Sequence, residues 1–126
     1  MDKTILLVDD EPDMLEVLGL RLKKVGYKVI TAVTGEECLQ KAEENYPDLI
    51  LLDILLPGMS GFEVVRQLKA KAVTKDIPII MITALIGKDA ETKGLERGAD
   101  YFISKPFDPE ELLAKIETIL EKDDNK

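Results

Sequence analysis

Short apolar runs alternate with longer stretches of helical spacing along this chain, and this alternation restricts the fold more than any other feature. Apolar residues in the longer stretches recur every three or four positions, as on one face of an amphipathic helix. A strand followed by a helix, repeated five times, predicts an α/β fold with a parallel sheet covered by helices on both faces. The five apolar runs are Ile5–Val8, Val29–Ala32, Leu49–Leu52, Ile79–Ile82 and Tyr101–Ile103.

The composition of these runs predicts the order of the strands in the sheet. The first, third and fourth runs are continuously apolar, as expected of strands that are buried on both faces. The second strand, Lys28–Thr31, and the fifth, Tyr101–Ser104, mix polar and apolar residues, which suits the edges of a sheet. These edges predict the doubly wound order 2-1-3-4-5 of a flavodoxin-like, three-layer α/β/α fold. A ligand site is then expected beside the first strand, beyond the carboxyl ends of the strands.

Polar residues, glycines and prolines mark the expected ends of the helices. Pro109 suits the first position of the last helix, and Gly26 and Gly98 fall where helices are expected to stop. Three pairs of residues have the spacing of a capping box, in which an N-cap side chain and a Glu three residues later satisfy backbone N–H groups. The pairs are Thr34 with Glu37, Ser60 with Glu63, and Asp108 with Glu111.

Length and composition restrict the class of protein. The 126 residues suit one domain, and 45% hydrophobic with 33% charged residues excludes disordered and low-complexity chains. The net charge of −8 argues against direct binding of nucleic acid or anionic membranes. There is no His, and the single cysteine, Cys38, is expected to pack on the apolar side of a helix. We expect one cytoplasmic domain over 1–126, with a core of about 3–120, a charged tail at 121–126 and no membrane segment.

Polar residues follow four of the predicted strands at the carboxyl edge of the sheet. They are Asp9 and Asp10 after the first strand, Asp53 after the third, Thr83 after the fourth and Lys105 after the fifth. Taken singly, each is also explained by an ordinary strand end or a solvated surface position. Together, the three carboxylates would repel one another unless a cation joined them, and carboxylates favour a hard divalent ion such as Mg²⁺. A Lys and a hydroxyl beside that ion predict a phosphoryl site with Asp53 as the nucleophile.

Four short motifs occur in order along the chain: Leu6–Asp10, Leu52–Gly61, Ile82–Ala84 and Lys105–Phe107. They resemble the motifs of the receiver domain of two-component response regulators, including its single-domain chemotaxis-type members, and the resemblance covers roughly residues 3–120. It implies that Asp53 accepts a phosphoryl group from a sensor histidine kinase or a histidine phosphotransfer protein. A receiver of this kind catalyses its own phosphorylation and dephosphorylation and is not expected to be a classical enzyme.

The resemblance implies a metal site. Asp10 and Asp53 would bind Mg²⁺ or Mn²⁺ directly, Asp9 would bind it through water, and the backbone carbonyl of Leu55 would be a further ligand. The two positions that tune hydrolysis of the acyl phosphate in this family correspond to Leu55 and Leu85, which are both apolar. Neither side chain can orient an attacking water by a hydrogen bond, so we expect a long-lived phosphorylated state.

The resemblance also implies a switch. Thr83 is similar to the hydroxyl that moves toward the phosphoryl group, Lys105 to the lysine that contacts it, and Phe102 to the aromatic residue that turns inward. The Lys105–Pro106 bond is commonly cis in this family. Phosphorylation would then change the surface of helix four, strand five and helix five, where a downstream target or an output domain would bind.

Two positions bear on the oligomeric state. Tyr101 and Glu117 replace the acid and base that dimeric DNA-binding members carry near these positions, so a monomer is expected before phosphorylation.

The residues alone leave other functions open. A receiver-like docking module that is never phosphorylated is the main alternative to the phosphorylated switch. A flavodoxin-like FMN carrier shares the sheet, but Asp9 and Asp10 would repel its phosphate. An aspartate-nucleophile phosphatase normally has its nucleophile after the first strand.

Overall fold

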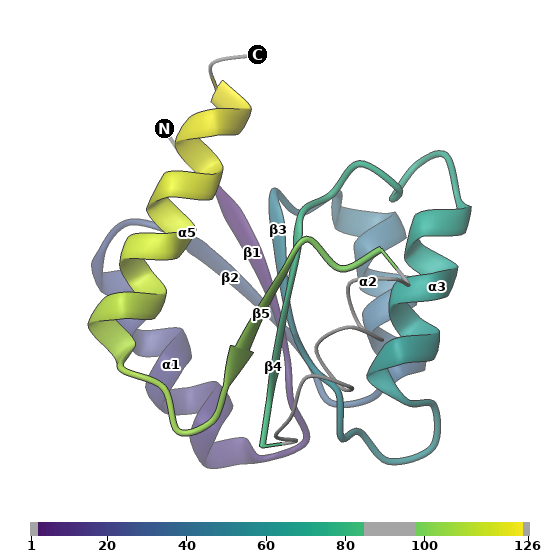
Figure 1. The fold of residues 1–126 in the computed structure, drawn as a ribbon, viewed down its shortest axis with the longest axis horizontal. Helices are drawn as coiled ribbons and strands as arrows, with labels where there is room; N and C mark the ends of the chain where they lie inside the picture. Colours follow the sequence, from purple (N-terminus) through teal and green to yellow (C-terminus); the bar gives the residue numbers. More distant parts are fainter. Residues whose placement is uncertain (1–2, 85–97, 125–126) are drawn as a thin grey trace.

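The computed structural model describes residues 3–84 and 98–124, which form a sheet with helices on both faces (Figure 1). The strands are β1 (Thr4–Val8), β2 (Lys28–Ala32), β3 (Leu49–Asp53), β4 (Ile79–Thr83) and β5 (Tyr101–Ser104). The helices are α1 (Pro12–Lys24), α2 (Gly35–Asn45), α3 (Gly61–Ala70) and α5 (Pro109–Asp124). The segment expected to form a fourth helix, with Leu85, lies outside the described residues.

The five strands are parallel and lie in the order β2-β1-β3-β4-β5, which confirms the predicted doubly wound fold. Helices α1 and α5 cover one face of the sheet, and α2 and α3 cover the other (Figure 1). Because all strands point the same way, their carboxyl ends meet at a single edge. This edge brings together Asp53, the last residue of β3, and the residues that follow β1 and β5.

Alternating side chains of the strands divide the core into two layers. In β1, Ile5 and Leu7 pack in the layer beneath α1 and α5, while Leu6 and Val8 pack in the layer beneath α2 and α3. Every residue of β3 is buried, whereas β2 exposes two of its residues at the edge of the sheet. Burial on both faces therefore explains the continuously apolar runs of the inner strands.

Side chains cap the helices largely as predicted. The Thr34 hydroxyl accepts a hydrogen bond from the Glu37 N–H at 3.1 Å, and Ser60 accepts one from the Glu63 N–H at 3.3 Å. At α5 the pairing differs by one residue, because the Asp108 carboxylate accepts from the N–H of Glu110 rather than of Glu111. An acceptor two residues ahead of its donor forms an Asx turn, which satisfies the same end of the helix.

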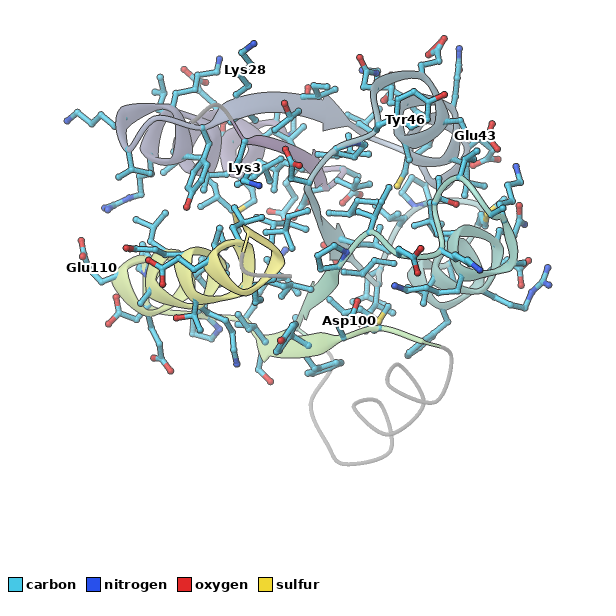
Figure 2. All side chains as sticks on the ribbon, turned by 90° about the horizontal axis from the view of Figure 1, so that it is seen from above. Lys3, Lys28, Glu43, Tyr46, Asp100 and Glu110 are labelled. Carbon is cyan, nitrogen blue, oxygen red and sulfur yellow. The ribbon has the colours of Figure 1, made fainter. Side chains whose placement is uncertain are left out.

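Charged side chains such as Lys28 and Glu110 lie at the periphery of the molecule (Figure 2). Cys38 instead is fully buried beside Ala42 on the inner side of α2, which confirms its packing role. Burial raises the pKa of the Cys38 thiol to about 12, so it stays protonated at neutral pH. Among the residues that the structure describes, no helix is both long enough and apolar enough to cross a membrane.

Candidate functional site

Two buried carboxylates lie side by side at the carboxyl edge of the sheet. Asp53 is the last residue of β3 and Asp9 directly follows β1, and these two strands are neighbours in the sheet. Asp53 is 5% exposed and Asp9 is 3% exposed, which is unusual for ionisable residues. Asp10 is exposed next to them, and one carboxylate oxygen from each of the three residues lies within 4.8 Å of the others.

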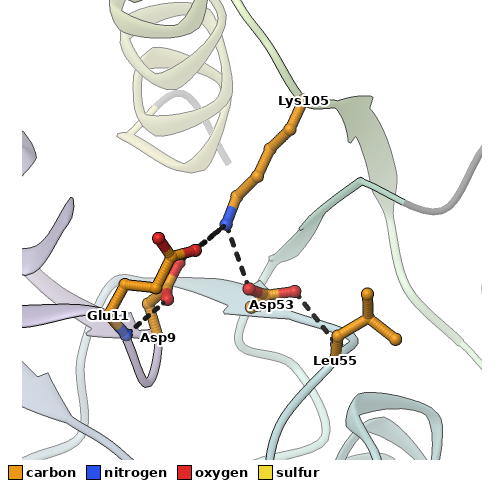
Figure 3. Close-up of polar contacts among 5 residues, drawn as sticks. All are labelled: Asp9, Glu11, Asp53, Leu55 and Lys105. Carbon is orange, nitrogen blue, oxygen red and sulfur yellow. Dashed lines mark hydrogen bonds and ion pairs between the residues drawn. The ribbon is translucent and has the colours of Figure 1, made fainter.

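Lys105 connects the two buried carboxylates. It follows β5, and its Nζ donates to Oδ2 of Asp9 at 3.0 Å and to Oδ2 of Asp53 at 3.1 Å (Figure 3). Oε1 of Glu11 lies 3.6 Å from the same Nζ. The Lys105–Pro106 peptide bond is cis, as the family resemblance implies. Strands at opposite ends of the chain therefore meet in one ion-pair network.

The second oxygen of each buried carboxylate is held by the backbone. The N–H of Glu11 donates to Oδ1 of Asp9 at 2.9 Å, and the N–H of Leu55 donates to Oδ1 of Asp53 at 3.0 Å (Figure 3). Each aspartate thus accepts one bond from the residue two positions later and one from Lys105. These bonds fix the orientation of both carboxylates, so that Oδ2 of each faces the lysine.

Burial and pairing act in opposite directions on the charges of this site. Burial raises the pKa of Asp53 above its ordinary value, against the Leu55 N–H and Lys105, which lower it. For Lys105, burial opposes the positive charge, but the hydrogen bonds to Asp9 and Asp53 outweigh it and raise its pKa. The ammonium is therefore firmly charged, while the Asp53 carboxylate lies where additional positive charge would stabilise it.

The donor set fits a small hard cation. Mg²⁺ binds oxygen ligands at about 2.0–2.1 Å, so opposite ligands are about 4.2 Å apart, and it uses one or two carboxylates while keeping several waters. The oxygens of Asp9, Asp10 and Asp53 need only a small adjustment from their spacing of up to 4.8 Å, which the exposed Asp10 permits. The predicted further ligand is the carbonyl of Leu55, which lies in the loop after β3 and is 51% exposed.

The other predicted residues lie on the same edge or below it. Thr83 is the last residue of β4 and pairs in register with Ser104 of β5, one residue before Lys105. Phe102 of β5 is half-buried against the core layer beneath α2 and α3. The roles of Thr83 and Phe102 in a switch remain predictions.

The family model for the response regulator receiver domain matches residues 5–117. This chain belongs to the response regulator receiver family. PhoB of Pseudomonas aeruginosa, a phosphate regulon transcriptional regulatory protein, is 45% identical over 120 residues, which are 95% of this chain and 52% of that protein. PhoP of Bacillus subtilis, an alkaline phosphatase synthesis transcriptional regulatory protein, is 45% identical over 122 residues, which are 97% of this chain and 50% of that protein.

Solved receiver structures have the same fold. A CheY-like response regulator receiver domain protein from Methanospirillum hungatei superposes with a TM-score of 0.92 at 34% identity, covering 99% of this receiver and 98% of that chain. The receiver spans about half the length of the curated relatives that it matches. Receiver domains bind Mg²⁺ in an acidic pocket and accept phosphoryl groups from histidine kinases. The family match decides for a receiver over an FMN carrier with the same sheet.

The sequence motifs assign no separate role to Glu11 or to the backbone N–H groups that hold the aspartates. An Asp followed two residues later by a free backbone N–H is the usual signal for such a bond, and both Asp9 and Asp53 precede a loop. The contact of Glu11 with Lys105 joins residues far apart in sequence. No local pattern indicates it.

Proposed function

We propose that this receiver is a phosphorylation-dependent switch in which Asp53 accepts a phosphoryl group from a phosphohistidine. The donor would be a sensor histidine kinase or a histidine phosphotransfer protein, since the chain itself has no His. One observation carries the proposal: Asp53 is buried, oriented by the Leu55 N–H and paired with Lys105, in the midst of two further aspartates. A carboxylate nucleophile for phosphoryl transfer requires such an oriented position beside positive charge and candidate metal ligands.

In the reaction, a carboxylate oxygen of Asp53 forms a bond to phosphorus as the bond from phosphorus to the donor imidazole nitrogen breaks. The electron pair of that bond returns to the imidazole. The Leu55 N–H keeps Oδ1 of Asp53 in place, while Oδ2 accepts from Lys105 and has no backbone partner among these bonds. Once the phosphoryl group arrives, the Lys105 ammonium donates to one of its oxygens and stabilises the charge that develops there.

Asp9, Asp10, Asp53 and the carbonyl of Leu55 would hold Mg²⁺ or Mn²⁺, which when bound neutralises charge on the phosphoryl oxygens. The chain's own contribution is to keep Asp9 buried and oriented by the Glu11 N–H, so that little reorganisation is needed. Water later hydrolyses the acyl phosphate and resets the receiver. Because each receiver carries its product until hydrolysis, we classify it as a switch and not as a classical enzyme.

Thr83 and Phe102 would transmit the change, with the Thr83 hydroxyl drawn toward the phosphoryl group and Phe102 turning inward. The surface that would change includes β5 and α5. A groove of about 350 Å³ on this side is lined by residues of β5, the following loop and α5, among them Phe102, Phe107 and Lys115. A downstream target or an output domain would bind there, and we propose a monomer before phosphorylation.

The test is phosphorylation by a small donor. The receiver is incubated with acetyl phosphate and Mg²⁺, and intact mass is measured for the wild type, Asp53→Asn and the control Asp76→Asn, which alters an exposed aspartate. We expect one added phosphoryl group on the wild type and on the control, and none on Asp53→Asn. An equal adduct on Asp53→Asn would refute Asp53 as the acceptor. No adduct on any of the three would favour the docking module.

A further inference from the structure

Glu11 is an exposed residue whose carboxylate contacts the buried site but is not among its candidate metal ligands. Its side chain is 67% exposed, while those of Lys105, Asp9 and Asp53 are 14%, 4% and 6% exposed. Glu11 is the N-cap residue of α1, yet its side chain makes no capping bond to the helix. Its carboxylate instead lies 3.6 Å from the Lys105 ammonium, next to Asp9 (Figure 3).

Lys105 occupies the carboxylates that a metal ion needs. Its Nζ lies 3.0 Å from an oxygen of Asp9 and 3.1 Å from an oxygen of Asp53, and both residues are in the candidate metal-ligand set. A divalent cation that binds those oxygens repels the ammonium, since like charges in a poorly solvated site interact strongly. The ammonium must then move to another acceptor, and the Glu11 carboxylate is already within ion-pair distance.

We propose that Glu11 is a positioning residue that takes over the Lys105 ammonium when a divalent cation binds to the aspartates. Glu11 thereby favours cation binding and keeps the lysine beside Asp53, ready to contact an incoming phosphoryl group. The backbone supports this arrangement, because the Glu11 N–H is bonded to Asp9 and holds residue 11 at the rim of the site. This inference rests on the proposed function for the metal, but its test does not depend on phosphorylation.

The test is a double-mutant cycle on Mg²⁺ affinity, measured by isothermal titration calorimetry with MgCl₂ alone. We expect Glu11→Gln to weaken Mg²⁺ binding by about two- to fivefold, the range that a partly exposed ion pair supports. The control Glu16→Gln, on the exposed side of α1, should change the affinity less. In a Lys105→Met background, where there is no ammonium to move, the effect of Glu11→Gln should shrink toward that of the control.

Glu11→Asp separates reach from charge. It keeps the negative charge but shortens the side chain by one methylene. If Glu11 acts by holding Lys105, the shorter carboxylate should no longer reach the ammonium, and Glu11→Asp should weaken Mg²⁺ binding nearly as much as Glu11→Gln does. Equal effects of Glu11→Gln with and without Lys105, or wild-type affinity in Glu11→Asp, would overturn the proposal. If either result is found and the wild type still shows Mg²⁺-dependent phosphorylation, the role of Glu11 is refuted while the proposed function stands. No Mg²⁺ binding by the wild type would overturn both this proposal and the metal site.

Discussion

Replacing Gly61 by alanine is expected to destabilise the domain because there is no room for a methyl group at the start of α3. A Cβ at this position would lie 2.6 Å from the Cα of Ile54 and 2.7 Å from the carbonyl oxygen of Asp53, whereas ordinary contacts begin at 3.4 Å. Both obstacles are backbone atoms, one at the end of β3 and one at the start of the loop that follows it. The Gly61 N–H also donates to the Ile54 carbonyl at 2.9 Å, so the helix and the loop cannot separate freely.

The expected cost follows from this geometry. Overpacking a core typically costs 1–3 kcal/mol, and because backbone must move here we expect about 3 kcal/mol. For a domain of 126 residues this lowers Tm by roughly 10 °C. Gly19→Ala is the matched control, since its Cβ would meet only Val29 Cγ1 at 3.9 Å in the middle of α1. Alanine is the better helix former, so Gly19→Ala should stabilise the domain by about 0.5–1 kcal/mol.

Equilibrium unfolding in urea, followed by circular dichroism at a helix band, measures both variants. Gly61→Ala should shift the midpoint down and Gly19→Ala should shift it up, with unchanged slopes. A Gly61→Ala protein as stable as the wild type would refute the steric argument. Relief of the clash displaces the backbone of Asp53, so under conditions where the variant is folded it should also be phosphorylated more slowly than the wild type.

Three further predictions follow from single contacts. Asp53→Asn should raise Tm in the presence of EDTA, because burial raises the pKa of Asp53 and the charged carboxylate is therefore less stable in the folded protein. The contribution of Asp53 to stability is complete below pH 3.8 and is lost as the pH rises through the pKa of the folded state. A lower Tm would contradict this. Cys38 should not react with a thiol reagent at pH 8 until the chain is unfolded. The stability that its buried thiol contributes is complete below pH 9, the value of a free thiol, and is lost as the pH rises toward 12; rapid native-state labelling would contradict this burial. Thr34→Ala should cost about 1 kcal/mol in urea unfolding through loss of the bond from the Glu37 N–H, and no change would show that the cap is dispensable.

The strand order and the location of the site were predictable because both depend on short-range patterns. Continuous apolar runs identify strands buried on both faces, and Asp53 interrupts such a run, which is costly unless a cation is near. The cap at Thr34 was equally local. The sequence does not distinguish the hydrogen bond from the Glu110 N–H to the Asp108 carboxylate from a capping box. An Asp side chain can accept from an N–H two or three residues ahead, and the conformation of the loop determines which bond forms.

Contacts that join distant segments were less accessible. The position of Lys105 at the edge of the sheet follows from the topology, but its sharing between Asp9 and Asp53 depends on side-chain reach. The proximity of Glu11 to the ammonium depends on the rotamer of an exposed side chain, which no sequence pattern determines.

The bond between Lys105 and Asp9 joins residues that are 96 positions apart. During synthesis, Asp9 and Asp53 leave the ribosome well before β5, and until β5 pairs with β4 no lysine from it is present to accompany them. Closing so long a loop costs more conformational entropy than forming a local contact. The Asp53 carboxylate therefore has its counter-ion only once β5 has joined the sheet, and a chain that stops short of β5 leaves this carboxylate without that partner. Completion of the sheet and neutralisation of its buried carboxylates thus depend on the same strand.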